Sequence, residues 1–524
     1  MPTSGLMNFR HCAAVALLLA SPLPAAEEPA PAKHVVVVVW DGMRPDFVND
    51  HNTPTLAALA RDGVVFKNNH SAYPSSTNVN GAVLATGMPP NRTGIVANQE
   101  FRPEIDPLKP FDTADFPALN APDAGISAKF LVVPTLAEIV QRAGFPTAVA
   151  GSKPVAQLFD RARQRESDAA KNSIVVYRGK ALPASAEAEI TSALGPFPTE
   201  KAFPKTSENN WTTRALTEVL WKDEVPKFSL LWLSDPDLTE HHTAPGSPAA
   251  LAAIKGSDDN LAKVLAALKT KNALTNTDII VVSDHGFSTV DRLVDVAARL
   301  QAAGFHAVRA WSAQPPAGRI LVVTLGGSVG FYVAGHDAAV ISRLIDFLQS
   351  SDFAGVILTR DAHPGTFTLA QAQLDTPTAP DLLVALSWNG RPNEFGASGG
   401  MTSDIGRQTG QGSHSTMSPH DMHNLLVASG PDFRHGWTNE TPSGNIDVAP
   451  TVLELLGIKP PQRMSGRVLR EALRNPDKSP AADEQDIIAQ RKLGDRIWRQ
   501  HLRTMTVSGV TYFLEGDGGS TPQL

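Results

Sequence analysis

The segment Val35–Trp40 constrains the fold more than any other part of the chain, because it consists of five valines and a tryptophan with no charged residue. A continuous apolar run of this length is typical of a strand that is buried on both faces, as in a parallel sheet covered by helices. The runs with the same character are Phe228–Leu233, Asp278–Val282, Asp381–Ala385 and Asn424–Ala428. The sequence therefore favours an α/β fold built on a large central sheet.

Helical patterns lie between these apolar runs. They cover Thr53–Arg61, Pro134–Gln141, Thr212–Leu220, Ala250–Leu268, Val294–Ala302, Ala338–Leu348 and Asp447–Leu456. Strands that alternate with helices predict one large, doubly wound α/β domain. The segment from about Phe287 to Gln411 is richer in Gly, Pro and Thr, and we interpret it as an insertion that decorates the sheet. Near the end of the chain, Glu484–Arg503 is predicted to form a charged amphipathic helix, followed by a short strand at Val510–Leu514.

The first 26 residues are typical of a secretory signal peptide. The apolar run Cys12–Ala20 is shorter than the roughly 20 residues that cross a bilayer, and small residues follow it up to Ala26. An uncleaved interfacial anchor is the alternative. Residues 27–33 form a Pro/Ala/Glu linker, so residues 34–524 are predicted to be a single domain that is periplasmic or secreted.

Composition excludes several classes of protein. The chain is 42% hydrophobic, which is too apolar for a disordered protein. Its formal net charge of −7 gives no global basic field, so nucleic acid is not expected as a partner. A single cysteine excludes a disulfide framework and a zinc site built on thiolates. Any metal ion must therefore be held by Asp, Glu and His, and the oligomeric state stays open.

Acidic and imidazole side chains follow three of the predicted strands. Asp41 follows the first strand, Asp237 and His241 follow the second, and Asp284 and His285 follow the third. In open α/β sheets, ligands bind at the carboxyl ends of the strands. Carboxylates and neutral imidazoles are the ligands of zinc and related ions. Each pair alone is more often a turn or a cap, but their joint occurrence at strand ends predicts a metal site.

A hydroxyl-rich cluster precedes another apolar helical segment. Ser75, Ser76 and Thr77 stand where the helix is expected to begin. Such residues commonly cap a helix by accepting hydrogen bonds from its first N–H groups. The same position places a hydroxyl against the positive end of the helix dipole, where a phosphate can bind. The spacing alone does not choose among the three as a nucleophile.

Taken together, these motifs resemble the type I phosphodiesterase/nucleotide pyrophosphatase family of the alkaline phosphatase superfamily. The resemblance runs from about Val35 to Leu469, with its motifs in the family's order. The matching segments are Val38–Asp46, Thr53–Ala60, Tyr73–Asn80, Ala85–Gly87, Gly94–Asn98, Pro236–His241, Ser283–Gly286, Gly412–His414, Asp421–Phe433 and Asn445–Thr451. It implies an alkaline-phosphatase-like fold, with a mostly parallel central sheet, helices on both faces and an inserted segment at about 287–411.

The resemblance also implies a hydrolase with two Zn²⁺ per chain. One zinc is expected on Asp41, Asp284 and His285 with Thr77, and the other on Asp237, His241 and His414. Thr77 is the expected nucleophile, which forms a phospho-threonine intermediate that water hydrolyses. Asn80 is expected to hydrogen-bond a phosphate oxygen. The substrate is then a small phosphorylated molecule with a phosphodiester or pyrophosphate bond.

Two departures from the family pattern point away from a strict nucleotide pyrophosphatase. Nucleotide-cleaving members have an aromatic residue two positions before the asparagine at the nucleophile, whereas this chain has Asn78 there. After His414 the sequence is Ser-Thr-Met rather than Gly-Tyr-Asp.

Lys153 admits two interpretations, a solvated surface lysine or a side chain that reaches the phosphate, as in some phosphomonoesterases of the superfamily.

Other functions on the same scaffold stay open. A phosphomonoesterase of the alkaline phosphatase type and a phosphonoacetate-type hydrolase would use the same nucleophile, and a metal-binding scaffold without catalysis is the non-enzyme alternative. A sulfatase is disfavoured because the C/S-x-P-x-R context of its nucleophile is absent.

Overall fold

The computed structural model describes residues 1–3, 32–114, 131–161, 165–199, 201–476 and 478–522. The predicted signal segment, including Cys12, lies outside these residues apart from Met1–Thr3. Residues 31–524 form one compact unit. Within the described part of the chain, no helix has both the length and the apolarity that a membrane span requires.

The centre of the fold is a nine-stranded sheet in the order β22-β2-β21-β10-β1-β9-β6-β7-β8. The first predicted strand, β1 (His34–Trp40), runs parallel to both β10 (Thr277–Val282) and β9 (Phe228–Leu233). Parallel pairing continues through β6 (Thr147–Gly151) to β7 (Ile174–Tyr177). Antiparallel pairs lie toward the two edges. On one side, β21 (Leu426–Ser429) is antiparallel to both β10 and β2 (Val64–Phe66), and β22 (Trp437–Asn439) closes the sheet in parallel with β2. On the other side, β8 (Lys180–Leu182) is antiparallel to β7.

Helices cover both faces of this sheet, as the uninterrupted valine run predicts. Val35, Val37 and Val39 belong to one apolar core with α2 (Thr77–Thr86), α6 (Leu136–Arg142) and α15 (Val448–Leu455). Val36 and Val38 belong to the opposite core with α1 (Pro54–Asp62), α9 (Thr206–Arg214) and α11 (Pro248–Thr270). Because side chains alternate between the faces of a strand, every β1 valine is buried. The fold is thus an alkaline-phosphatase-like α/β fold.

The segment that we interpreted as an insertion forms two further sheets. The six-stranded one follows the order β12-β13-β14-β17-β15-β16 and packs on α12 (Val296–Ala302) and α13 (Ala338–Ser350). Its strands are β12 (Ala307–Val308), β13 (Ile320–Thr324), β14 (Ser328–Val333), β15 (Ala354–Thr359), β16 (Phe367–Thr368) and β17 (Leu382–Leu386). The apolar run Asp381–Ala385 therefore lies in this sheet and not in the central one.

A four-stranded sheet in the order β18-β19-β11-β20 links the insertion to the central sheet. Its strands are β18 (Trp388–Pro392), β19 (Ser398–Asp404), β11 (Ser288–Val294) and β20 (Gly412–Ser413). β11 begins three residues after His285, and β20 ends immediately before His414. This sheet therefore connects two of the predicted metal-binding segments.

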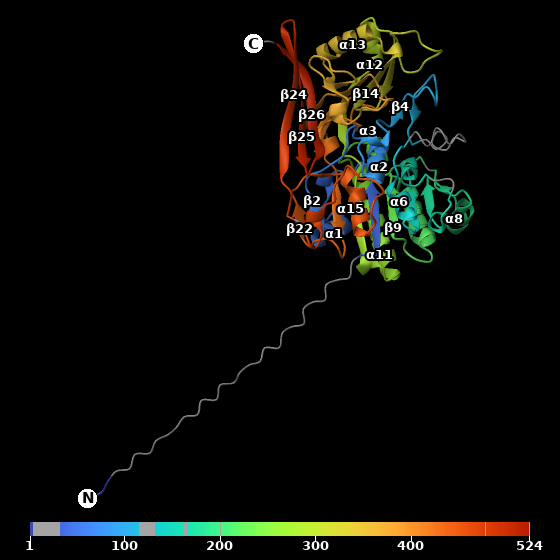
Figure 1. Ribbon diagram of the computed structural model, residues 1–524, viewed down its shortest axis with the longest axis vertical. Helices are drawn as coiled ribbons and strands as arrows, with labels where there is room; N and C mark the ends of the chain where they lie inside the picture. The colour runs from blue at the N-terminus through green and yellow to red at the C-terminus, as the bar shows by residue number, and fades with distance from the viewer. Residues whose placement is uncertain (4–31, 115–130, 162–164, 200, 477, 523–524) are drawn as a thin grey trace. The chain divides into compact units, whose positions relative to one another are not determined.

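The helix predicted at Glu484–Arg503 was wrong, whereas the strand predicted at Val510–Leu514 is confirmed and is longer than expected. The chain forms a three-stranded antiparallel sheet of β24 (Ala482–Leu493), β25 (Arg496–Val507) and β26 (Val510–Pro522) (Figure 1). Burial alternates along β25, where Trp498, Gln500 and Leu502 are buried between more exposed neighbours. This period of two is the pattern of a half-buried strand and not of a helix.

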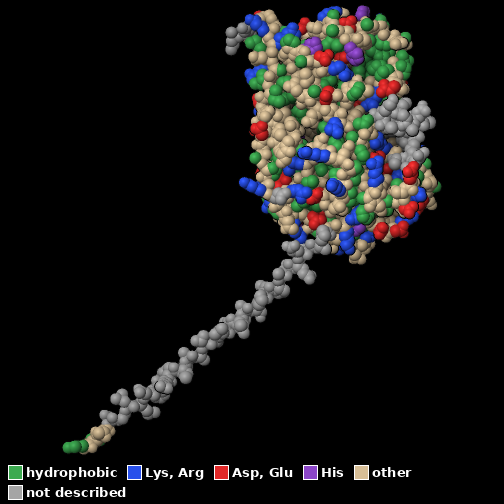
Figure 2. Space-filling model, viewed as in Figure 1, with side chains coloured by type: hydrophobic (Ala, Val, Ile, Leu, Met, Phe, Trp, Pro, Cys, Tyr) green, Lys and Arg blue, Asp and Glu red, His purple; other side chains and the backbone are tan. Residues whose placement is uncertain are grey.

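Charged side chains of both signs are scattered over the face shown in Figure 2. Basic and acidic groups are interspersed there, in keeping with the modest net charge of −7. This face therefore presents no large region of a single sign of charge.

A buried Asp/His cluster at the edge of the central sheet

The pairing of β1 with β9 and β10 brings the three predicted strand ends together. Asp41 follows β1, Asp237 begins the short helix α10 (Asp237–Glu240) after β9, and Asp284 and His285 follow β10. The backbone ties these segments to one another, since Asp237 N–H donates to the Asp41 carbonyl. Gly42 N–H donates to Asp284 Oδ1 at 3.0 Å. All four side chains are buried.

His241 and His414 complete the cluster. His241 is one helical turn beyond Asp237, and His414 comes from the far end of the inserted segment. The imidazole rings of His285 and His414 stack with centroids 3.8 Å apart, and those of His241 and His414 are 5.1 Å apart. The structure therefore assembles all six predicted Asp and His residues in one place.

Each of the three histidines is held by a backbone carbonyl on one side of its ring. Nδ1 lies 3.1 Å from Gly412 O in His241, 2.8 Å from Gly286 O in His285 and 2.8 Å from Ser75 O in His414. A carbonyl only accepts, so Nδ1 carries the proton and Nε2 is left with a free lone pair. A metal-bound histidine is typically oriented in this way.

The free Nε2 atoms face the carboxylates. Asp237 Oδ1 lies 3.3 Å from His241 Nε2, 3.6 Å from His414 Nε2 and 3.9 Å from His285 Nε2. Asp284 Oδ2 lies 3.3 Å from His285 Nε2. Two ligand groups, Asp237/His241/His414 and Asp41/Asp237/His285, have donor atoms close enough to share an ion. Asp237 thus stands between both groups, whereas the prediction assigned it to one.

Two carboxylate oxygens in this cluster lack a hydrogen bond. They are Asp237 Oδ1 and Asp284 Oδ2. A buried acceptor without a hydrogen bond costs free energy unless a cation satisfies it. Such oxygens, beside three oriented imidazoles, fit the ligand chemistry of divalent zinc.

The electrostatics agree with a site that needs cations. Burial, reinforced by Asp284, raises the pKa of Asp41 well above its usual value. Burial also raises the pKa of Asp237, but Lys153 and His241 outweigh it and hold that pKa well below the usual value. Burial lowers the pKa of His414 well below its usual value. The histidine is therefore neutral at pH 7, as a metal ligand must be.

Lys153 lies inside the cluster. Its side chain is 14% exposed, and Nζ lies 2.6 Å from Asp237 Oδ2 and 2.9 Å from Asp41 Oδ1. Burial lowers the pKa of Lys153, but Asp237 and Asp41 outweigh it and raise that pKa above its usual value. Of our two interpretations, the solvated surface lysine is therefore wrong, and the ammonium group is within the site.

Thr77 is the first residue of α2, and its Oγ1 lies 3.3 Å from His285 Nε2. Ser75 Oγ instead donates to the Thr416 carbonyl at 2.9 Å, which ties it to a loop. Ser76 is the N-cap residue, and its buried Oγ has no hydrogen-bond partner. Only the Thr77 hydroxyl is thus brought into contact with the Asp/His cluster.

The expected contact between Asn80 and a phosphate disagrees with the structure. Asn80 is fully buried, and its Nδ2 donates to the carbonyls of Ala72 and Ser76. Its Oδ1 accepts from Ala72 N–H and from Asn445 Nδ2. The amide is therefore consumed in holding the loop that leads into Thr77, and Asn80 positions the nucleophile segment.

Sequence reasoning missed Asn98 as a site residue, although it ends the matching segment Gly94–Asn98. Asn98 Oδ1 accepts from the backbone N–H of Asn78 at 2.8 Å, directly after Thr77. No hydrogen bond from Asn98 Nδ2 is found within the described part of the chain, and the residue is partly exposed. The side chain thus offers a free N–H₂ group beside the start of α2.

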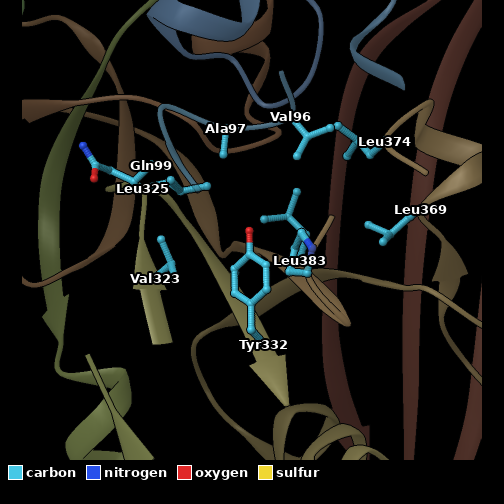
Figure 3. Close-up of a pocket in the computed structure, with 11 residues that line it drawn as sticks. Val96, Ala97, Gln99, Val323, Leu325, Tyr332, Leu369, Leu374 and Leu383 are labelled. Atoms are coloured by element: carbon cyan, nitrogen blue, oxygen red, sulfur yellow. The ribbon is translucent and has the colours of Figure 1, made fainter. Parts of the chain in front are cut away.

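Packing fixes the loop that contains Asn98. Val96, Ala97 and Gln99 line a small apolar cavity together with residues of the six-stranded sheet, among them Tyr332, whose hydroxyl points toward this loop (Figure 3). Phe101 N–H donates to Tyr332 Oη at 3.4 Å. The insertion therefore positions a loop that contacts the nucleophile segment.

Comparison with known proteins identifies the family. The model of the type I phosphodiesterase / nucleotide pyrophosphatase family matches residues 35–392. The chain belongs to this family. It is 23% identical over 477 residues to a venom phosphodiesterase of Macrovipera lebetinus. The matched region covers 89% of this chain but only 48% of the venom enzyme. The chain thus spans about half the length of the venom enzyme.

Two further similar proteins are matched over nearly their whole length. Ectonucleotide pyrophosphatase/phosphodiesterase family member 7 of Mus musculus is 21% identical over 485 residues, covering 91% of this chain and 97% of that protein. A solved structure of murine ectonucleotide pyrophosphatase/phosphodiesterase 5, an inactive threonine-to-alanine variant in complex with AMP, has a TM-score of 0.58 and 18% identity. It covers 82% of this chain and 97% of the murine chain. The family membership supports hydrolysis of phosphoric esters.

Proposed function

We propose that this chain is an exported two-zinc phosphodiesterase that cleaves phosphodiester or pyrophosphate bonds through a phospho-threonine intermediate on Thr77. The observation that supports it best is the orientation of His241, His285 and His414. All three donate Nδ1–H to backbone carbonyls and turn Nε2 toward buried carboxylates. The signal-like residues 1–26 support export.

Asp41, Asp284 and His285 would hold one zinc with Thr77, and Asp237, His241 and His414 would hold the other. Asp237 belongs to both groups of candidate ligands and would be available to either ion. Bound zinc lowers the pKa of hydroxyl groups and offsets the negative charge that develops on oxygen during displacement. The three buried carboxylates make this compensation necessary, since the described residues bring only Lys153 into ion-pair contact with them as a permanent cation.

Thr77 is proposed as the nucleophile. Its Oγ1 attacks phosphorus, a P–O bond to Thr77 forms, the P–O bond to the leaving group breaks, and water later releases the phosphoryl group. The position of Thr77 at the first residue of α2 favours an anionic substrate, because the helix N-terminus presents free N–H groups and a positive dipole end. Asn98 Nδ2 is proposed to donate to a phosphate oxygen beside it.

Lys153 favours a second candidate, a phosphomonoesterase. An ammonium group in the cluster would pair with the additional terminal charge of a monoester. The membership of the phosphodiesterase family supports the diester, and the position of Lys153 supports the monoester. Both share Thr77 and the same metal ligands.

Turnover of bis-p-nitrophenyl phosphate against p-nitrophenyl phosphate tests the choice. We expect a higher kcat/KM for the diester, loss of both activities with a chelator and recovery with Zn²⁺. Equal or higher efficiency on the monoester would replace the diesterase by the phosphatase. Hydrolysis that survives metal removal would contradict the metal mechanism.

A further inference from the structure

Arg407 lies on a loop of seven residues, 405–411, that joins β19 to β20 and so leads into His414. Both ends of this loop are anchored. At its start, Asp404 accepts from Val296 N–H and from Arg309. At its end, Gly410 N–H donates to Val290 O and Val290 N–H donates to Gln411 O. Arg407 is thus presented from a loop that is fixed at both ends.

The strand β20, which directly follows this loop, packs against the second predicted metal group. Gly412 O accepts from His241 Nδ1, and a Cβ atom on Gly412 would meet Glu240 O at 2.6 Å and the ring of Phe287 at 2.6 Å. Phe287 in turn packs edge-on against His241, with ring centroids 5.0 Å apart. The strand in which the loop ends is therefore in direct contact with the segment that presents Asp237 and His241.

Arg407 itself is half-buried and has no hydrogen bond or ion pair with any residue that the structure describes. Burial lowers the pKa of its guanidinium, and Asp237 is the negative charge that acts in the opposite sense. The positive charge of Arg407 also contributes to the lowered pKa of His241, after burial itself. The charge of the guanidinium therefore interacts with those of Asp237 and His241, but no carboxylate of the described residues pairs with it directly, so its partial desolvation is only partly compensated.

Asp237 does not need Arg407 as a partner. Lys153 already lies 2.6 Å from Asp237 Oδ2, and two imidazoles face Oδ1. No carboxylate of the described residues comes within ion-pair distance of Arg407. An anion from the substrate is the missing partner, and a guanidinium recognises carboxylate or phosphate through paired hydrogen bonds.

The geometry of the displacement reaction indicates which part of the substrate carries this anionic group. In-line displacement places the entering and leaving oxygens on opposite sides of phosphorus. Thr77 Oγ1 lies against His285, so the leaving group is expected toward Asp237, His241 and His414. Arg407 acts on that side.

We propose that Arg407 binds an anionic group on the leaving-group part of the substrate. The preferred substrates are then phosphodiesters or pyrophosphates whose leaving group itself bears a carboxylate or a phosphate. This inference rests on the proposed phosphodiesterase function and narrows its substrate class. Arg407 acts in binding and orientation and takes no part in the bond-breaking step.

Two matched chromogenic esters test it: methyl p-nitrophenyl phosphate, and its analogue with a carboxylate beside the nitro group. With the zinc-loaded enzyme, Arg407→Gln should lower kcat/KM for the carboxylated ester about tenfold and change the plain ester less than about twofold. Arg407→Lys should restore part of the loss. Gln408→Ala, on the same loop with its side chain exposed, is the control and should change neither.

Binding separates this inference from the function on which it rests. In a zinc-loaded Thr77→Ala background, calorimetry should show the carboxylated ester binding about tenfold more weakly when Arg407→Gln is added. If wild type hydrolyses neither ester, the proposed function is wrong, and the calorimetric ratio still decides the role of Arg407. Equal losses on both esters, or no loss on either, would overturn the inference.

Discussion

The Nζ atom of Lys153 lies 2.6 Å from Oδ2 of Asp237, in the middle of a cluster whose other members are ligands suited to zinc. Without metal, this ammonium group is the permanent cation that compensates Asp237 and Asp41. Once metal ions are bound, the carboxylates have other partners, and Lys153 becomes available to a phosphate oxygen.

This relationship predicts that the contribution of Lys153 to stability depends on metal. In the presence of a chelator, Lys153→Met should lower the free energy of unfolding by about 3 kcal/mol, because it leaves buried carboxylates uncompensated. With Zn²⁺ bound, the difference should fall below about 1 kcal/mol. Urea denaturation with and without chelator measures both values. Lys67→Met, at an exposed ion pair with Glu440, is the control, and an equal loss in both conditions would contradict the prediction.

The two asparagines near Thr77 should separate catalysis from stability. Asn98→Ala should lower kcat by about 100-fold with little change in melting temperature, because only a donor to the reacting phosphate is lost. Asn80→Ala should lower stability by about 2 kcal/mol, because buried partners in the loop before Thr77 lose their hydrogen bonds. Steady-state kinetics and thermal unfolding of both variants measure this. A stable Asn80→Ala enzyme whose only defect is in kcat would restore Asn80 as a phosphate ligand.

Asp278 predicts a pH-dependent stability outside the active site. Burial, reinforced by Asp432, raises the pKa of Asp278 to about 8. The folded state therefore holds a proton on Asp278 that the unfolded chain releases near pH 4. The contribution of protonated Asp278 to stability is fully present below that pH and is lost as pH rises toward about 8.

Asp278→Asn mimics the protonated acid and should remove this dependence. The melting temperature of the variant relative to wild type should rise between pH 5 and pH 8. A constant difference over that range would mean that Asp278 is already ionised in the folded protein. Asp483→Asn, at an exposed position of β24, provides a control with no such trend.

The C-terminal sheet should be part of the folding unit. Trp498 is fully buried among residues of the six-stranded sheet, and its Nε1 donates to the Gly365 carbonyl at 2.9 Å. Trp498→Ala should lower stability by about 4 kcal/mol through a large cavity, whereas Trp498→Phe should lower it by much less. Neither change touches the Asp/His cluster, so kcat at low temperature should stay near wild type. A loss below about 1 kcal/mol for Trp498→Ala would show that the sheet contributes little.

The sequence was most informative where the local pattern decides the structure. The run Val35–Trp40 predicted a strand buried on both faces, and the acids and imidazoles after β1, β9 and β10 met because parallel strands end at one edge of a sheet. The helix predicted at Glu484–Arg503 failed because charged residues obscured the alternation of Trp498, Gln500 and Leu502. Two-residue turns at Gly494-Asp495 and Ser508-Gly509, with positive φ at Gly494, Ser508 and Gly509, were the signals for strands.

Residues placed by long-range packing were harder to foresee. Lys153 is brought to Asp237 by strand pairing of β6 with β9, and nothing near it in sequence distinguishes it from a surface lysine. Asn98 and Arg407 lie on loops whose positions depend on the inserted sheets. The choice of Asn80 followed its spacing from Thr77, but burial commits that amide to its own loop.

The metal content of the purified protein tests the central claim most directly. Inductively coupled plasma mass spectrometry after Zn²⁺ loading and desalting should give about two zinc ions per chain for wild type and for Thr77→Ala. Asp284→Asn and His241→Ala should each retain about one, because each removes a ligand from a different group. One ion or none in wild type, or two in both ligand variants, would contradict the two-metal account.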